Sequence, residues 1–228
     1  YYSSESKVFH YHGSHHNNTP ERLIKTKKTI LFNMKSFGIH SDNLQIKQSD
    51  IFPIYIHNKA SKKNLIKNLD SINQKFKYKF LIFINNNMKI NKNNKYFTYQ
   101  RKIRESSNQD YYLSDVINYY KKIILKYSQD KEYLLICSDD FNGISSSFLK
   151  RSLKVINDYF PDTIFAARKT LDPIFLNDKG KTIRLNELNK SRKKNKPLLI
   201  GKRKHGIIIH TSNLFKQDKF SGIIKLIY

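Results

Sequence analysis

The chain has 228 residues, 39% hydrophobic and 13% aromatic, which suffices for one α/β domain with a sizeable core and excludes a disordered protein. Its 43 Lys and Arg residues against 18 Asp and Glu give a formal charge of +25, which attracts polyanions such as nucleotide phosphates, nucleic acid or acidic lipid. No apolar run reaches the roughly 18 residues of a membrane span and no secretory signal pattern is present, so we expect a cytoplasmic protein without a membrane span.

The lysines are spread along the chain and accompany many Asn, Ile and Tyr residues, which favours a compositional origin of the charge over a nucleic-acid surface. The densest basic run, residues 190–204, is the best candidate for an anion-binding surface. The single cysteine, Cys137, excludes an internal disulfide. Its place in an apolar run predicts a buried structural thiol rather than a nucleophile.

The first 28 residues differ from the rest, because residues 11–20 are rich in turn residues and histidine and have no apolar period. The histidines lack a cysteine partner and the spacing of a zinc finger, so we expect a solvated loop. The phrase His-x-His-Gly-x-His, which starts at His10, resembles the end of family 2 glycosyltransferases. We therefore expect a tail over residues 1–28, the end of a preceding glycosyltransferase domain, and a second domain over residues 29–228 that is truncated at its C-terminus.

From residue 29 on, strand-like and helix-like segments alternate. Apolar runs predict strands at residues 29–32, 80–84, 133–137 and 163–167 and a late strand from His205, and residues 51–56 form a further apolar segment, interrupted by Pro53. Helical spacing of apolar residues predicts helices over residues 65–76, 113–127 and 148–156, and residues 178–180 predict a hairpin turn. This alternation predicts a Rossmann-like α/β fold with a mostly parallel sheet and helices on both faces. Ligands bind such sheets at the carboxyl ends of the strands, here residues 33–43, 85–87 and 138–142.

The polar loop after the first expected strand contains Ser36, Gly38 and Asn43. A glycine-containing loop at the end of a strand can present backbone N–H groups to a phosphate. Residues 33–43 are therefore the first candidate for a nucleotide site.

This loop resembles the first motif of the acylneuraminate cytidylyltransferase family, Arg-x-x-Ser-Lys-Gly-Ile-Pro-x-Lys-Asn, which holds CTP. The matching positions are Ser36, Gly38, Ile39 and Asn43, and the three basic positions of the family are here Asn33, Phe37 and Asp42. The resemblance implies that Ser36, Gly38 and Asn43 bind the nucleotide and makes Asn33 and Lys35 the catalytic candidates. Because loss of one charge-stabilising group commonly costs ~10²–10³ in rate, we expect reduced, altered or lost activity.

The resemblance continues in order to the end of the chain. It implies a place for Arg101 in the nucleotide pocket, and it implies substrate contacts for Asn142, Arg192, Lys193, Arg203 and His205. In the family an arginine holds the carboxylate of a sugar acid, and the resemblance gives this carboxylate contact to Arg192, Lys193 and Arg203. The resemblance therefore implies a Mg²⁺-dependent enzyme, dimeric in the family, that uses CTP to activate a sialic-acid type of sugar acid to its CMP-sugar for surface polysaccharide synthesis. The family's Asp-x-Asp metal ligands would follow after the last residue of this chain.

A second interpretation rests on Ser138-Asp139-Asp140, directly after an expected buried strand. It resembles the Asp-x-Asp step with which a family 2 glycosyltransferase of the GT-A type binds Mn²⁺ or Mg²⁺ and a nucleotide-sugar. The same acidic residues, with the serines at 145–147, also fit the N-terminus of a helix. Both explanations of Asp139 and Asp140 stay open.

A third interpretation is a polyanion-binding protein without catalysis, based on the net charge, residues 190–204 and the tyrosines. No RNA-binding signature accompanies these features, so nucleic acid is the least favoured partner.

Overall fold

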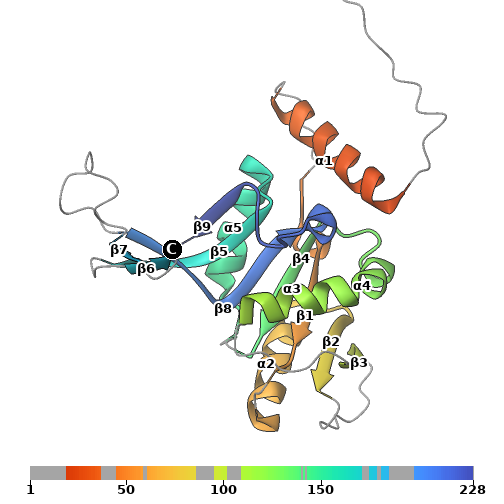
Figure 1. Cartoon of the computed structure of the whole chain (residues 1–228). Helices are drawn as coiled ribbons and strands as arrows, with labels where there is room; N and C mark the ends of the chain where they lie inside the picture. The colour runs from red at the N-terminus through yellow and green to blue at the C-terminus, as the bar shows by residue number, and fades with distance from the viewer. Residues whose placement is uncertain are drawn as a thin grey trace, which may run out of the picture.

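The computed structural model describes residues 19–36, 45–58, 61–85, 95–101, 109–139, 141, 143–170, 175–178, 181–184 and 198–227 (Figure 1). Their centre is a seven-stranded sheet in the order β3-β2-β1-β4-β8-β5-β9. The strands are β1 (Ile51–Ile56), β2 (Phe80–Asn85), β3 (Tyr96–Arg101), β4 (Tyr133–Ser138), β5 (Thr163–Thr170), β8 (Leu198–His210) and β9 (Ile224–Ile227). Neighbouring strands are parallel except around β8, which is antiparallel to both β4 and β5. The predicted α/β fold with a mostly parallel sheet is confirmed.

Helices cover both faces of the sheet (Figure 1). On one face α2 (Lys62–Lys75) and α5 (Ser146–Tyr159) bury their apolar sides, and on the other face α3 (Gln109–Tyr119) and α4 (Lys121–Tyr127) do so. A serine caps the N-terminus of α2 and another caps that of α5. Ser61 accepts a hydrogen bond from the Asn64 amide, and Ser145 accepts one from the Phe148 amide. Each supplies an acceptor to an N–H group that the helix itself leaves unpaired.

β1 and β4 lie in the middle of the sheet, and every one of their residues is buried. Burial on both faces explains why their sequences are continuous apolar runs rather than alternating ones. The segment at 51–56 is a full strand even though Pro53, opposite Leu135, cannot donate to the hydrogen-bond ladder.

The helix predicted over residues 113–127 is two helices that meet at Tyr120. The Tyr120 ring is buried and stacks on Phe83 with 4.5 Å between ring centroids. Its hydroxyl donates to the Gln100 carbonyl over 3.0 Å. These contacts tie the junction to the β2–β3 side of the sheet, where an uninterrupted helix was expected.

The strand predicted at residues 29–32 is wrong, because these residues belong to the helix α1 (Pro20–Ser36). A four-residue apolar run does not distinguish a strand from a helix. The start signals favour the helix: Thr19 accepts from the Arg22 amide, Pro20 takes the first helical position, and Lys25 pairs with Glu21 one turn away. The helix also runs without a break across the expected domain boundary between residues 28 and 29.

Three smaller expectations can be compared with the structure. The expected hairpin agrees with the antiparallel pairing of β6 (Phe175–Asp178) with β7 (Lys181–Arg184), and residues 179 and 180 of its turn lie outside the described residues. The late strand exists but starts at Leu198, before the expected His205.

Cys137 is fully buried, which raises the pKa of its thiol, as expected of a structural cysteine. Within the described ranges, none of the helices has the length and apolar character that a membrane crossing needs.

Candidate functional site at the carboxyl ends of β1 and β4

The carboxyl ends of β1 and β4 lie side by side, with Ile56 opposite Ser138. From β1 the sheet continues through β2 and β3 to one edge, and from β4 it continues through β8 to the other. The order of the strands therefore changes direction between β1 and β4. A point of this kind is where open α/β sheets bind ligands, because the loops after the two strands separate there.

A single carboxylate connects the ends of these two strands. Asp139 directly follows β4; its Oδ1 accepts from the Tyr55 hydroxyl over 3.2 Å and its Oδ2 accepts from the Asn58 amide over 2.9 Å. Asn68 of α2 in turn donates its side-chain amide to the Tyr55 hydroxyl over 3.1 Å. Burial of Tyr55 and the nearby charge of Asp139 raise the pKa of the tyrosine, so the hydroxyl stays protonated and donates.

The turn after β1 is fixed on two sides. The His57 amide donates to the Phe83 carbonyl of β2 over 2.8 Å, and the Asn58 amide donates to Asp139. Both side chains are buried, His57 to 2% and Asn58 to 8% exposure. These contacts hold the backbone of His57 and Asn58 in place at the carboxyl end of β1.

The N-terminus of α2 lies at this same end of the sheet, since α2 returns antiparallel to β1. Lys62 and Lys63 occupy its first turn and Lys67 its second, and no acidic residue lies in the first turn. Unpaired N–H groups and the helix dipole make a helix N-terminus favourable for an anion. The lysines add to this positive field.

The loop between β4 and α5 closes the other side. Gly143 has φ +94°, where any other residue is strained, and a Cβ there would lie 2.9 Å from the Ser71 hydroxyl of α2, which would have to move. Nδ1 of His205, from β8, donates to the Gly143 carbonyl over 2.9 Å, and the His205 ring stacks on Phe148 with centroids 5.8 Å apart. Elements from β8, α2 and the β4–α5 loop thus meet around Gly143, in the loop that follows Asp139.

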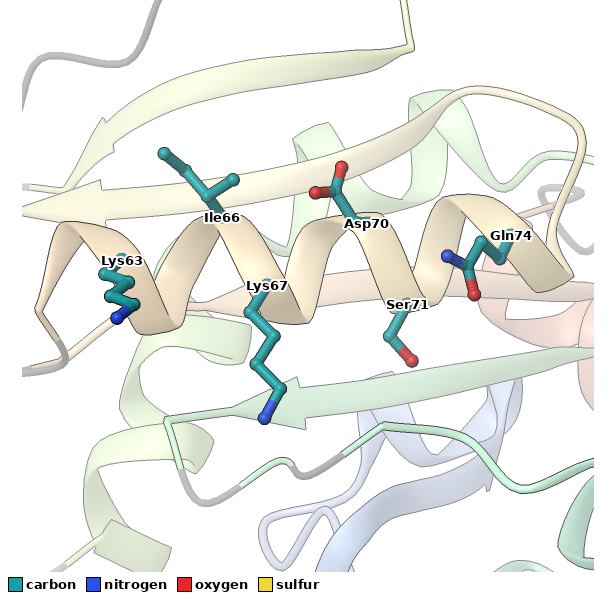
Figure 2. Close-up of a pocket in the computed structure, with 6 residues that line it drawn as sticks. All are labelled: Lys63, Ile66, Lys67, Asp70, Ser71 and Gln74. Atoms are coloured by element: carbon teal, nitrogen blue, oxygen red, sulfur yellow. The ribbon is translucent and has the colours of Figure 1, made fainter.

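A shallow hollow of about 440 Å³ lies on the outer face of α2, and all its lining residues come from that helix (Figure 2). They are Lys63, Ile66, Lys67, Asp70, Ser71 and Gln74. This face is opposite the buried side of α2, so the hollow is not the meeting point of the strand ends. Lys67 and Ser71 point to the side of α2 on which β4 and its following loop lie (Figure 2). The hollow therefore extends the basic surface beside the site rather than forming a site of its own.

Two predicted site residues, Asp139 and His205, lie at this carboxyl end of β4. Arg101 ends β3, whose carboxyl end faces the same way, and Arg203 lies in β8. Asn33, Lys35 and Ser36 belong to α1 and follow no strand. Other candidates lie outside the described residues: Gly38, Asn43, Asp140, Asn142, Arg192 and Lys193. The nucleotide and substrate roles given to these residues stay predictions.

The expected helix N-terminus is present and is capped by Ser145, one of the serines predicted there, and not by Asp139. Asp139 instead binds the Tyr55 hydroxyl and the Asn58 amide. No group of three or more His, Cys, Asp or Glu side chains gathers as a metal site within the described ranges. The metal-binding interpretation of Asp139 and Asp140 therefore stays a prediction.

Sequence reasoning missed the basic N-terminus of α2 as part of the site. A signal for it existed, because Ser61 precedes a helical apolar period and follows a buried strand after a short polar stretch. The link from Tyr55 and Asn68 to Asp139 had no such signal, since each residue lies on a different element.

No protein-family model and no curated protein sequence matches this chain. Solved structures with a similar arrangement include the bifunctional IspDF from Campylobacter jejuni, at 11% identity and a TM-score of 0.46 over 78% of this chain and 49% of that one. They also include the 2-C-methyl-D-erythritol 4-phosphate cytidylyltransferase from Francisella tularensis, at 12% identity and a TM-score of 0.42 over 71% and 74% of the two chains. A mutant UDP-glucose pyrophosphorylase from Leishmania major has 10% identity and a TM-score of 0.39 over 73% and 51%. This chain spans about half the length of IspDF. Likenesses of this size concern the arrangement of the chain and bear on neither its substrate nor its activity.

Proposed function

We propose that this chain binds CTP at the carboxyl ends of β1 and β4 and is a cytidylyltransferase-type protein that activates a sugar acid. The observation that carries the proposal is the meeting of a basic helix N-terminus, at Lys62 and Lys63, with the point where the strand order changes direction. A polyphosphate suits this place because it can accept from backbone N–H groups and pair with lysines. We therefore propose the phosphates at the start of α2 in preference to residues 33–43, because residues 29–32, which precede that segment, lie in α1 and do not form the expected strand.

The choice of CTP and a sugar acid rests on the resemblance of the sequence to acylneuraminate cytidylyltransferases. By this resemblance Arg192, Lys193 and Arg203 are proposed to meet the sugar carboxylate, and His205 is proposed as a further substrate contact. Of these, His205 has its side chain described, and it lies beside Gly143 at the candidate site. The product would be a CMP-sugar of sialic-acid type, which supplies surface polysaccharide synthesis.

In the proposed reaction a hydroxyl oxygen of the sugar acid attacks the α-phosphorus of CTP. A bond forms between this oxygen and phosphorus, the bond to the bridging oxygen breaks, pyrophosphate leaves with the electron pair, and the hydroxyl proton is released. The charge that develops on the phosphates needs cationic partners. Lys62 and Lys63 supply part of the positive charge. Asn33 stands where the family has its loop arginine, so we expect slow or absent turnover.

Mg²⁺ is the expected cofactor, because it would neutralise charge on the phosphates in such a reaction. The described residues contain no gathered set of ligands for it, and both carboxylate oxygens of Asp139 already accept hydrogen bonds. No step of the proposal runs through a metal, and Mg²⁺ stays a prediction.

Calorimetric titration of the chain with CTP and separately with UDP-sugars tests the proposal, each with Mg²⁺ and with Mn²⁺. We expect micromolar binding of CTP and weaker binding of UDP-sugars. Binding of UDP-sugars alone, and only with Mn²⁺, would instead support a GT-A glycosyltransferase, which the position of Asp139 directly after β4 favours. Failure of both ligands to bind would refute nucleotide binding by this chain.

A further inference from the structure

We infer that Asp139 is a positioning residue: it holds the backbone of Asn58 after β1 and, through Tyr55 and Asn68, it holds α2 with its basic N-terminus in place for an anion. The inference deepens the proposed function and rests on it for the identity of the anion. It assigns Asp139 a task other than binding a metal or capping a helix.

The contacts carry this inference. Asp139 belongs to the end of β4, yet both of its oxygens accept from the β1 side, one from the Tyr55 hydroxyl and one from the Asn58 backbone amide. Tyr55 is fully buried, and its hydroxyl accepts from Asn68 of α2. The donor to Oδ1 of Asp139 is therefore held in a fixed position. One carboxylate therefore connects β4, β1, the turn and α2.

Two backbone contacts fix the residues that follow β1. The His57 amide is bound by the Phe83 carbonyl, which fixes the first residue after β1. The Asn58 amide is bound by Asp139, which fixes the second. Asp139 also reaches α2 through Tyr55 and Asn68, and α2 carries Lys62 and Lys63 in its first turn.

Chemistry distinguishes this task from metal binding. An asparagine at 139 can still accept from the Asn58 amide with its oxygen, while its NH₂ group donates to the Tyr55 oxygen. An alanine can do neither, and leaves a buried amide without its acceptor. A positioning role thus predicts a milder effect for Asp139→Asn than for Asp139→Ala, and an effect that is present without metal.

The test compares Asp139→Ala, Asp139→Asn and Tyr55→Phe with the wild-type chain, and uses Asp158→Asn, on the exposed side of α5, as a matched control. Hydrogen exchange of the Asn58 amide and the first turn of α2 is measured without ligand. The affinity for CTP is measured in EDTA and again with Mg²⁺. We expect faster exchange and roughly tenfold weaker CTP binding in Asp139→Ala under both conditions. Smaller changes are expected in Asp139→Asn and Tyr55→Phe, and none in the control.

Three results would overturn the inference. The first is unchanged exchange in Asp139→Ala, and the second is faster exchange with unchanged CTP affinity. The third is a loss of affinity that appears only with Mg²⁺, which would make Asp139 a metal ligand. If the wild-type chain binds no CTP, the proposed function fails, and the exchange data alone then decide whether Asp139 holds the turn.

Discussion

Lys28 of α1 donates a hydrogen bond of 2.6 Å to Asp162, which precedes β5 and lies 134 residues further along the chain. Lys216 donates to the same carboxylate oxygen over 2.9 Å, and the Ile223 amide donates to the other over 2.9 Å. The neighbouring Lys27 forms an ion pair with Glu132, just before β4. Partly buried ion pairs therefore hold α1 against the end of the sheet opposite the candidate site (Figure 1).

Replacing Asp162 by alanine should remove three hydrogen bonds at once and loosen α1. Hydrogen bonds to a charged group contribute about 1.5–3 kcal/mol each to stability when well formed, and these three share one carboxylate. We expect the free energy of unfolding in urea to fall by about 2–3 kcal/mol, and the amides of α1 to exchange faster. A change as small as that of the exposed control Asp158→Ala would show that α1 is held by other contacts.

The same carboxylate should make stability depend on acid. Burial alone would raise the pKa of Asp162, but hydrogen bonds from Lys28, the Ile223 amide and Lys216 outweigh it and lower the pKa to about 2. Because the folded-state pKa lies below the ordinary value of 3.8, this stabilisation is present above about pH 4 and is lost as the pH falls toward 2. The difference in unfolding free energy between wild type and Asp162→Ala should therefore shrink over this range. A difference that stays constant down to about pH 2 would contradict the assigned pKa.

His210 should make the chain less stable in mild acid. Burial, followed by the charge of Lys28, lowers the pKa of His210 from 6.5 to about 3, and its Nδ1 accepts from the Ser212 amide, as a neutral ring does. The unfolded chain takes up the proton first, so stability contributed by the neutral ring is lost as the pH falls below about 6.5. Between about pH 7 and about pH 5 we expect a loss of about 2 kcal/mol that His210→Asn, which can still accept from Ser212, abolishes. An equal loss in the variant would assign this pH dependence to other groups.

Gly143→Ala should disturb the candidate site more than its size suggests. The backbone at Gly143 has φ +94°, and the new methyl group would lie 2.9 Å from the Ser71 hydroxyl. We expect a loss of about 1–3 kcal/mol in unfolding free energy, with a shift of the His205 ring resonances in NMR spectra because His205 donates to the Gly143 carbonyl. Unchanged His205 resonances would show that the loop absorbs the substitution without moving the histidine.

Much of the fold could be predicted because its central strands are buried on both faces. Continuous apolar runs predicted β2 and β4, because a strand buried on both faces needs apolar residues throughout. Apolar residues at helical spacing predicted α2 and α5, because such a helix buries one side. Residues 29–32 were ambiguous, since a run of four apolar residues fits a strand or a helix, and the helix start at Thr19 and Pro20 was the better guide. The antiparallel insertion of β8 between β4 and β5 could not be predicted, because no local pattern states which distant strands pair.

The candidate site was predictable only in part, for a related reason. Asp139 was identifiable by its position after a buried strand. Its partners, Tyr55 in β1 and Asn58 two residues after β1, precede it by 84 and 81 residues, and the pairing of β1 with β4 brings them to Asp139. His205 lies at the carboxyl end of β4 because β8 pairs antiparallel with β4, and the sequence does not reveal this pairing.

The affinity of CTP for the wild-type chain and for the Lys62→Ala/Lys63→Ala variant is the most direct test of the central claim. The matched control is Lys122→Ala/Lys154→Ala, which removes the same charge from exposed positions on α4 and α5. We predict micromolar binding by the wild type and the control, and at least roughly tenfold weaker binding by the α2 variant. Equal affinity of all three chains, or no binding of CTP by the wild type, would contradict a phosphate site at the N-terminus of α2.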